Sequence, residues 1–505
     1  MSVSPIIRLT DEQDEIINTT PYEDGALVIS AFAGTGKTFT LQKYAEDRPK
    51  ETILYAAYNK AIQLDAESKM PINVSCRTTH SLAYRAIGAK YREIDMLRAS
   101  VPLWRISKLL KTNVVLSYFV MQTVNKFVAS ADRTLDESHI LDEALNYYNT
   151  GDDDDTRMPP IVDMATEVWE NMISTTPGTL PITHDTYLKL YQLSSPILNF
   201  DYILLDEAQD TTPCVWDIVN KQHAKKIITG DEHQTIYSWR GTINAMRFMQ
   251  DSDHLYLSQS FRFGPEVAKL ANTLLHRFKN EQVDLTGNPN VITQVYTNGN
   301  PDKYVTLARG NYHIYRAAAS EVLTGTNTLG FVGGDMTNYR FPFVLDAFYL
   351  MDDQHDKIKD PLIKSFTDFE ELKNYADKTR NPEIKSACVL AEEFKRRVPF
   401  IHQKVKQQDC GTRFAHLVFS TAHKSKGLEF PVVKLASDFT NLITSHIDHP
   451  LDGIMTVEEI NLLYVAITRA TRDLFISPTI KSFIETGSLM PIPLDIINLA
   501  EKIEA

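Results

Sequence analysis

Short apolar runs alternate with helix-period stretches in two separate blocks of this chain. In the first block the apolar runs are ALVISA (26–31), TILYAAY (52–58), DYILLD (201–206) and KIITGD (226–231). In the second block they are HLYLSQ (254–259), YVTLAR (304–309), FAHLVFS (414–420), PVVKLAS (431–437) and DLFIS (473–477). Buried strands that alternate with amphipathic helices are typical of parallel sheets. The pattern therefore predicts an α/β protein with two parallel sheets.

Two stretches with helical periodicity interrupt the blocks, at about 86–185 and about 341–411. The apolar positions of the first recur in WRISKLLKTNVVLSYFVMQTVNKFV and PPIVDMATEVWENMI, and those of the second in FEELKNYADKTR and KSACVLAEEFKRR. A run of four acids, Asp152–Asp155, falls in the first stretch, where a solvated loop is expected. We therefore expect a mainly helical insert in each α/β domain.

Length and composition narrow the protein class. A chain of 505 residues is too long for one core, and 43% hydrophobic with 23% charged residues is ordinary for a globular protein. The sequence shows no membrane-span pattern and no secretion-signal pattern. Its four cysteines are scattered, which disfavours disulfides or zinc and favours a reducing cytoplasm or nucleus. The net charge of −13 does not exclude nucleic acid, because a phosphate backbone responds to a local basic groove.

The stretch AFAGTGKT, from Ala31 to Thr38, joins a predicted strand to a predicted helix and nearly matches G-x-x-x-x-G-K-[ST]. Ala31 replaces the first glycine, where a tight turn with negative φ is enough. The later glycines let backbone N–H groups close around phosphates at a helix N-terminus. Lys37 supplies a charge, and the Thr38 hydroxyl is a ligand for Mg²⁺. The predicted ATP-binding residues of this loop are Ala33, Gly34, Thr35, Gly36, Lys37 and Thr38.

An acidic pair at the end of another strand would complete such a site. YILLDEAQD supplies Asp206 to hold the metal and Glu207 to orient or deprotonate the attacking water. The alternative, a buried strand that ends in solvated acids, is disfavoured by the phosphate loop upstream. The two motifs together predict a working site for ATP and Mg²⁺.

The order of the remaining motifs resembles that of superfamily 1 helicases. The matching segments are LTDEQDEII, YAAYNKAIQ (55–63), TTHSLAY (78–84), GDEHQTIYSWRG (230–241), LSQSFRFGPEV (257–267), STAHKSKGLEF (420–430) and NLLYVAITRAT (461–471). The segments IYSWRG and AITRA are similar to the UvrD/Rep-like branch. HSLAYRAIG, QSFRFG and HKSKGLEF resemble the helicase core of the eukaryotic F-box DNA helicases, although we do not expect an F-box before that core in this sequence.

The resemblance implies two RecA-like domains of the P-loop NTPase type, with ATP in the cleft between them and a single nucleic-acid strand across the top. The expected divisions are 1–85 with 186–256 for the ATP-binding domain 1A, 86–185 for insert 1B, 257–340 with 412–505 for domain 2A, and 341–411 for a short insert 2B.

The resemblance also implies roles for matching residues. Gln234 would sense the γ-phosphate, and Arg262 and Arg469 would act as arginine fingers. The implied catalytic set is Lys37, Asp206, Glu207, Gln234, Arg262 and Arg469. Beyond the phosphate loop, the implied nucleotide contacts are Gln13, Phe39 and Phe261 at the adenine, and Gly427 and Glu429 near the ribose and phosphates. Many relatives have arginine at position 39, so an adenine contact from phenylalanine there would be by stacking or absent.

On the nucleic-acid side, Tyr237 and Trp239 alternate along one stretch, and an aromatic ring stacks on any base without reading it. The alternative for Trp239 is a core position, which its polar neighbours Ser238 and Arg240 disfavour. The full predicted set is Tyr58, Asn59, Lys60, Thr79, His80, Tyr237, Trp239, Arg240 and His423.

The sequence thus predicts an ATP- and Mg²⁺-dependent DNA helicase or translocase that acts on single-stranded DNA and on junctions with duplex. The 3′→5′ polarity comes from the resemblance alone. An RNA-acting motor stays open, because stacking and phosphate contacts tolerate a 2′-OH. A nucleic-acid-binding scaffold with a decayed ATPase is disfavoured by the intact catalytic set. Insert 2B is short and little of the duplex-splitting hairpin is seen, so translocation is better supported than the mode of strand separation.

Further expectations concern the setting of this protein. We expect a monomer without membrane association that works with replication, repair or recombination partners. The expected location is the nucleus in a eukaryotic host, or the nucleoid-containing cytoplasm in a prokaryotic or viral setting. A fused nuclease is not expected after about residue 485.

Overall fold

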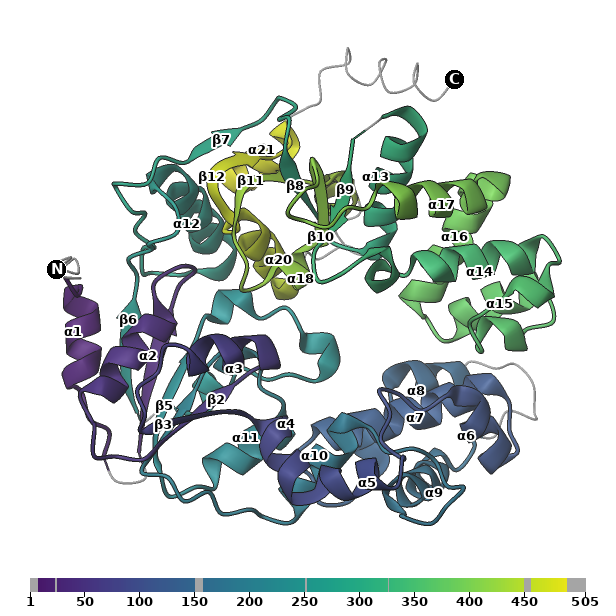
Figure 1. Cartoon of the computed structure of the whole chain (residues 1–505), viewed down its shortest axis with the longest axis horizontal. Coiled ribbons are helices and arrows are strands. Elements are labelled where there is room, and N and C mark those ends of the chain that lie inside the picture. The colour runs from purple at the N-terminus through teal and green to yellow at the C-terminus, as the bar shows by residue number, and fades with distance from the viewer. Residues whose placement is uncertain are drawn as a thin grey trace. The chain divides into compact units, whose positions relative to one another are not determined.

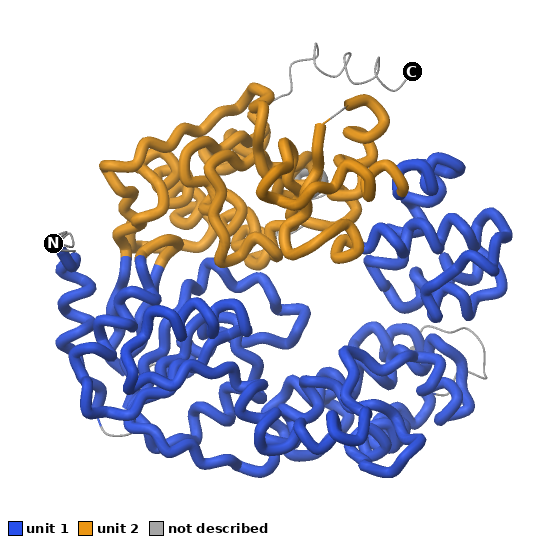
Figure 2. The backbone as a smooth tube through the Cα atoms, in the orientation of Figure 1, with its two compact units in different colours: residues 1–31, 36–257, 340–402 blue, residues 32–35, 258–339, 403–505 orange. Residues whose placement is uncertain are grey.

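The computed structural model describes residues 8–22, 25–149, 158–249, 252–325, 327–448 and 456–487, so the acidic run Asp152–Asp155 lies outside the described residues. The chain forms two compact units, which Figure 2 distinguishes by colour. Unit 1 comprises residues 1–31, 36–257 and 340–402, and unit 2 comprises residues 32–35, 258–339 and 403–505.

Unit 1 contains a six-stranded sheet in the order β3-β2-β4-β5-β1-β6, and every pair in it is parallel (Figure 1). Its strands are β1 (Ala26–Ala31), β2 (Ile53–Ala57), β3 (Val74–Thr78), β4 (Tyr202–Leu205), β5 (Lys225–Gly230) and β6 (Asp253–Leu257). Alternate residues of the central strands enter two different hydrophobic clusters, as expected for a sheet covered by helices on both faces. Leu27 and Ile29 join one cluster, and Ala26 and Val28 join the other.

The helices of unit 1 fall into three groups along the chain. Those near the sheet strands in sequence are α1 (Asp11–Asn18), α2 (Lys37–Glu46), α3 (Lys60–Glu67), α4 (Thr79–Ala83), α10 (His184–Leu193) and α11 (Pro213–Asn220). The first insert contains α5 (Ala89–Glu93), α6 (Leu103–Leu110), α7 (Val114–Ala129), α8 (Asp142–Asn149) and α9 (Ile161–Ile173), and it has a hydrophobic core of its own. The second insert contains α14 (Phe341–Met351), α15 (Phe369–Lys378) and α16 (Pro382–Phe394), and α17 (Val398–Gln408) leads from it into unit 2.

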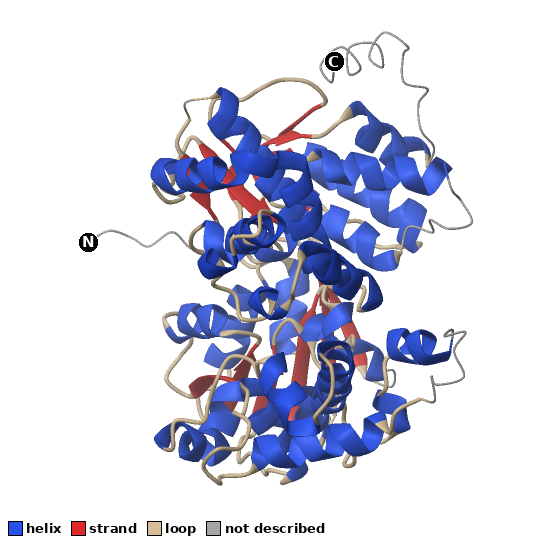
Figure 3. Cartoon of the chain, turned by 90° about the vertical axis from the view of Figure 1, so that its right-hand side faces the viewer, coloured by secondary structure: helices blue, strands red, loops and turns tan. Residues whose placement is uncertain are grey.

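Unit 2 contains a second six-stranded sheet, in the order β7-β12-β11-β8-β10-β9, again with parallel pairs only. Its strands are β7 (Gln294–Tyr296), β8 (Tyr304–Ala308), β9 (Leu329–Phe331), β10 (Leu417–Thr421), β11 (Phe430–Leu435) and β12 (Ala470–Phe475). Its helices are α12 (Pro265–Lys279), α13 (Asn311–Thr324), α18 (Ala422–Ser425), α19 (Ser437–Asp448), α20 (Val457–Ile467) and α21 (Pro478–Thr486). Figure 3 shows the strands of each sheet among their helices.

The predicted fold class, two parallel α/β sheets with helical inserts, is confirmed. One strand assignment is wrong: HLYLSQ was predicted in the second block, but β6 pairs with β1 and belongs to the first sheet. An apolar run indicates a strand but does not indicate which neighbour it pairs with. The prediction also missed β3, β7 and β9, because VSCRT is polar at three of its five positions and the other two strands have only three residues each. Among the described residues, no helix is both long and apolar enough to cross a membrane.

Candidate nucleotide and nucleic-acid sites

The phosphate-loop motif occupies the turn between β1 and α2. Ala31 is the last residue of β1 and pairs with Leu257, so its backbone is extended. The left-handed turn is instead made by Gly34, with φ +77°, and by Gly36, with φ +81°. Gly36 is also the N-cap of α2, whose first residue is Lys37. The prediction that Ala31 has a negative φ is confirmed, because the positive φ values of the loop fall on the two later glycines. That the loop binds nucleotide normally with alanine at position 31 stays a prediction.

The acidic pair follows β4 in unit 1 and lies beside the lysine of the loop. The Lys37 ammonium lies 3.4 Å from the Glu207 carboxylate, and both side chains are about 15% exposed or less. Asp206 is buried, with one carboxylate oxygen accepting a hydrogen bond of 2.9 Å from the Glu207 N–H. Glu207 has a left-handed backbone, with φ +54°, which is costly for a residue other than glycine. This sharp turn directly after β4 brings two carboxylates to the start of α2.

The pKa values of both Asp206 and Lys37 are raised from their ordinary values. Burial raises the pKa of Asp206 to about 6, and the charge of Glu207 adds to the effect, while Lys37 opposes it. For Lys37, burial acts to lower the pKa, but the charges of Glu207, Asp206 and Asp231 outweigh it and the pKa is raised. Lys37 therefore stays positively charged. Its single charge does not fully neutralise the two neighbouring carboxylates of Asp206 and Glu207.

These residues fit a Mg²⁺ ion. Mg²⁺ prefers hard oxygen ligands, and the buried Asp206 carboxylate is such a group. Thr38, which has a hydroxyl, follows Lys37 on the first turn of α2. The raised pKa of Asp206 marks a place where negative charge is crowded in a buried setting. A divalent cation there would favour the ionised carboxylate.

Two buried residues that sequence reasoning missed hold this acidic pair. The Tyr55 hydroxyl, on β2, donates a hydrogen bond to the Asp206 carboxylate. Burial and the charge of Asp206 raise the pKa of Tyr55 well above its usual range, so the hydroxyl keeps its proton. Gln209 donates to Glu207 at 2.5 Å and accepts from the Asp231 N–H at 3.1 Å. The DEAQD motif includes Gln209 as a signal, whereas nothing in the pattern around Tyr55 indicates an acid as its partner.

Gln234 joins the same network. It is buried and donates a hydrogen bond of 2.6 Å to the Asp231 carboxylate. Asp231 is bonded in turn to Gln209, which contacts Glu207. A side chain at position 230 would lie 2.3 Å from the Gln209 amide oxygen, which explains the glycine there. Unit 1 therefore links its predicted catalytic residues Lys37, Asp206, Glu207 and Gln234 through hydrogen bonds and charge.

The centre of the phosphate loop, residues 32–35, belongs to unit 2 and forms hydrogen bonds within that unit. The Ala33 N–H donates to the Tyr464 hydroxyl at 3.1 Å, and the Ser260 hydroxyl donates to the Ala33 carbonyl at 3.0 Å. The Phe261 N–H donates to the Gly34 carbonyl at 2.8 Å. A Cβ on Gly34 would lie 2.7 Å from Ser260 and from Arg262, so this glycine is required by close packing as well as by its φ value. Sequence reasoning did not anticipate Tyr464.

The two predicted arginine fingers are both held within unit 2. Arg262 donates to the Glu429 carboxylate at 3.1 Å and to the Thr468 carbonyl at 3.2 Å. Arg469 is 1% exposed and donates to the carbonyl oxygens of Val465 and Leu428 at 2.9 and 3.1 Å. Buried carbonyls thus fix the direction of the Arg469 guanidinium, and the structure brings Arg262 and Glu429 together.

The other predicted nucleotide contacts, at the adenine and near the ribose, have varied surroundings. Gln13 is buried and closes a capping box with Thr10 at the start of α1, so it has a structural role in this unit. Phe39 lies on α2 with the Lys43 ammonium 5.6 Å from its ring centre. In unit 2, Phe261 is 45% exposed and Gly427 has φ +80°. Their contact with a nucleotide stays a prediction.

An aromatic group lies in unit 1 where single-strand contacts are predicted. The Tyr58 and Tyr237 rings stack with centres 6.1 Å apart and planes 18° from parallel. The Arg240 guanidinium lies 5.4 Å from the Tyr237 ring centre and 4.9 Å from that of Trp239. Trp239 is 69% exposed, so the alternative of a core position is wrong. Four of the predicted residues therefore form one cluster, with an exposed indole face.

The other predicted nucleic-acid contacts are more dispersed. Asn59 is the N-cap of α3 and accepts from the Ile62 N–H, and Lys60 donates to Gln63 at 3.3 Å. Thr79 is buried, whereas His80 is partly exposed and lies 2.8 Å from the Asp185 carboxylate. His423 lies on α18 in unit 2.

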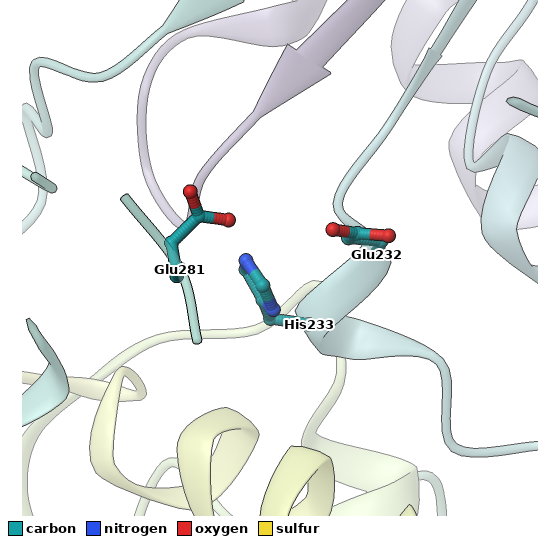
Figure 4. Close-up of side chains that lie close together, drawn as sticks. All are labelled: Glu232, His233 and Glu281. Carbon is teal, nitrogen blue, oxygen red and sulfur yellow. The ribbon is translucent and has the colours of Figure 1, made fainter. Parts of the chain in front are cut away.

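A further group of acids and histidine is drawn in Figure 4. Glu232 and His233 lie on the short helix η4 (Glu232–Gln234) of unit 1, next to Gln234. Glu281, drawn with them, belongs to unit 2, so the three residues do not define a metal centre within either unit.

Comparisons with known proteins show which family this chain resembles. The model of the UvrD/REP helicase N-terminal domain matches residues 191–254, and that of the UvrD-like helicase C-terminal domain matches residues 353–481. F-box DNA helicase 1 of Gallus gallus is 33% identical over 98% of this chain and 52% of its own length. F-box DNA helicase protein 1 of Schizosaccharomyces pombe is 31% identical over 94% of this chain and 58% of its own length. An arterivirus helicase structure, nonstructural protein 10, is 12% identical with a TM-score of 0.33 over 94% of this chain and 63% of that one.

The chain belongs to the UvrD/Rep-like family of superfamily 1 helicases. Within that family it is similar to the F-box DNA helicases, as the sequence motifs indicate. It spans between half and three-fifths of the length of those two relatives.

Proposed function

We propose that this chain is an ATP-driven DNA helicase or translocase that moves 3′→5′ along single-stranded DNA. The observation that carries the proposal is the arrangement in unit 1 of Lys37, Glu207 and buried Asp206 at the junction of β1 and α2. A lysine for the phosphates, a carboxylate for the metal and a second for the attacking water form a minimal hydrolysis site. Family membership supports DNA as the substrate, because the two F-box relatives are named DNA helicases.

We assign each residue of this site one role in ATP binding or hydrolysis. The loop from Ala33 to Thr38 binds the phosphates of ATP, and Asp206 and Thr38 hold Mg²⁺, which would neutralise charge on the β- and γ-phosphates. Glu207 orients the attacking water, and its bond to Gln209 aims the carboxylate. Gln234 senses the γ-phosphate through the same network.

Movement requires the two RecA-like domains to act on one nucleotide. We propose domain 1A at 1–85 with 186–256, insert 1B at 86–185, domain 2A at 257–340 with 412–505, and insert 2B at 341–411. Arg262 and Arg469 would then supply charge from domain 2A when the domains close on ATP. Coupling between that closure and the strand held by Trp239 would turn hydrolysis into translocation.

The first test measures ATP hydrolysis with no polymer, single-stranded DNA, duplex DNA and single-stranded RNA in parallel. Single-stranded DNA should stimulate most. Lys37→Ala should abolish the stimulated rate, whereas the matched control Lys43→Ala should retain it, because Lys43 pairs with Glu46 at the surface of the same helix. Equal stimulation by RNA would favour an RNA motor, and a rate that survives Lys37→Ala would contradict the ATPase assignment.

The second test addresses polarity. Duplexes with a single-stranded tail on either the 3′ or the 5′ side are incubated with ATP, and the released strand is measured. Unwinding only from the 3′ tail agrees with the proposal, and unwinding only from the 5′ tail contradicts it. A translocase without unwinding activity would still displace streptavidin from the 5′ end of a biotinylated strand. We also propose that the working form is a monomer located with the DNA, which sedimentation on a tailed duplex would test.

A further inference from the structure

Tyr55 contacts the metal-binding carboxylate from a neighbouring strand. It lies in the middle of β2 and is completely buried, and its hydroxyl donates to one oxygen of Asp206. The other carboxylate oxygen accepts the Glu207 N–H at 2.9 Å. Both oxygens of Asp206 are therefore engaged by donors, one from the backbone and one from Tyr55.

The parallel pairing of β2 with β4 explains this contact. Tyr55 is opposite Leu204, and both side chains enter the hydrophobic cluster on the α2 side of the sheet. Asp206 comes two residues after Leu204 and continues the same side-chain alternation. The Tyr55 hydroxyl reaches Asp206, which comes directly after the end of β4, and the next residue of β2 on the same face as Tyr55 is the small Ala57. The length of a tyrosine side chain is thus what allows a residue inside the sheet to reach an acid at its edge.

We propose that Tyr55 is a positioning residue that holds the Asp206 carboxylate in the orientation needed to bind Mg²⁺ with the nucleotide. This inference rests on the proposed ATPase function. Each carboxylate oxygen has two lone pairs, so one on each oxygen stays available for a cation or its water after the two hydrogen bonds. A neutral hydroxyl restrains the carboxylate without a positive charge that would compete with the metal. Such support from neighbouring groups commonly sets metal affinity.

The plainer explanation is that Tyr55 only fills the core and that its hydroxyl finds the nearest acceptor. Tyr44, on α2, is the matched control for that explanation. It is equally buried and belongs to the same hydrophobic cluster. Within the described part of the chain, the Tyr44 hydroxyl makes no hydrogen bond to Asp206 or to Glu207. If the two tyrosines only filled the core, loss of the Tyr55 hydroxyl and loss of the Tyr44 hydroxyl should have the same effect on Mg²⁺-dependent nucleotide binding.

The experiment compares Tyr55→Phe and Tyr44→Phe in the full chain, with fluorescent N-methylanthraniloyl-ADP as the probe. Affinity is measured in EDTA and across a Mg²⁺ titration. Tyr55→Phe should bind the probe with normal affinity in EDTA. It should require roughly tenfold more Mg²⁺ for the metal-dependent increase in probe affinity, because a lost hydrogen bond to a charged group has an effect of about this size. Mn²⁺ bound by the same complexes, counted from the loss of the free-ion electron paramagnetic resonance signal, should decrease in parallel. Tyr44→Phe should match the wild type in both measurements.

A double-mutant comparison separates positioning from packing. In an Asp206→Asn background the added Tyr55→Phe change should leave the Mg²⁺ dependence as it was, because Tyr55 acts through Asp206. If Tyr55→Phe proves unstable, Tyr55→Met removes the hydroxyl with a more adaptable side chain and should give the same tenfold shift. A Mg²⁺ titration within twofold of wild type for either soluble variant overturns the proposal, as does an equal shift in Tyr44→Phe. DNA-stimulated hydrolysis by the wild type, measured separately, decides the proposed function on its own.

Discussion

Replacement of Trp239 by alanine should weaken binding to single-stranded DNA while the fold is retained. The indole is 69% exposed, so its loss removes little buried surface. Substitutions at such surface positions usually change stability by no more than about 0.5 kcal/mol. The neighbouring Arg240 guanidinium lies 4.9 Å from the ring centre, and an exposed cation–π contact adds about 0.5–1 kcal/mol. The expected loss of folding stability is therefore small.

The expected loss of DNA affinity is larger. An aromatic side chain that stacks on a base contributes about 1–3 kcal/mol per base, or roughly 5- to 150-fold in affinity. No phosphate contact is removed, so the slope of log affinity against log salt should stay as in the wild type. Trp239→Phe should recover part of the affinity, because a smaller ring still stacks.

Fluorescence anisotropy with labelled oligo(dT) at several salt concentrations measures both the DNA affinity and its salt dependence. Trp104→Ala is the control, since Trp104 is also exposed, at 51%, but lies on α6 of the first insert. The reasoning is refuted if Trp239→Ala binds within twofold of Trp104→Ala at every salt concentration. A reduced salt slope with unchanged low-salt affinity would instead indicate a phosphate contact.

Three further substitutions probe the nucleotide site. Arg469→Ala should lower stimulated turnover by about 10³–10⁵-fold with ATP affinity within a few-fold of wild type, and turnover above about a tenth contradicts the arginine-finger role. Because Arg469 bonds buried carbonyls, the same change should cost about 1–3 kcal/mol of stability in a denaturant titration, and lysine should rescue turnover poorly. Gln209→Leu, which removes the bond to Glu207, should lower turnover roughly tenfold or more with little change in ATP affinity, and an unaltered rate would exclude a role in aiming the carboxylate. Ala31→Gly should leave ATP affinity nearly unchanged, because Ala31 is extended, and a tenfold gain would mean that the natural loop is impaired.

The sequence alone determined the features that are written in consecutive residues. The strand ALVISA, the two later glycines and Lys37 define a phosphate loop, because a strand end, a left-handed turn and a helix start need those residue types in that order. Asp206 and Glu207 of DEAQD could be recognised in the same way, because they directly follow the buried apolar run of a strand. Parallel strands place their carboxyl ends at one edge of a sheet, so two distant motifs could be predicted to meet there. The exposure of Trp239 was predicted from its immediate neighbours, since polar flanks disfavour burial.

Only the tertiary structure decided which side chains meet across strands and loops. Tyr55 reaches Asp206 because the register of β2 against β4 and the length of the phenol place the hydroxyl there. Tyr464 binds the Ala33 N–H although the two residues are 431 positions apart in the chain. The assignment of β6 to the first sheet depended on strand pairing in the same way. Hydrogen-bond partners and strand neighbours are set by which surfaces pack together, and a local pattern of apolar and polar residues does not contain that information.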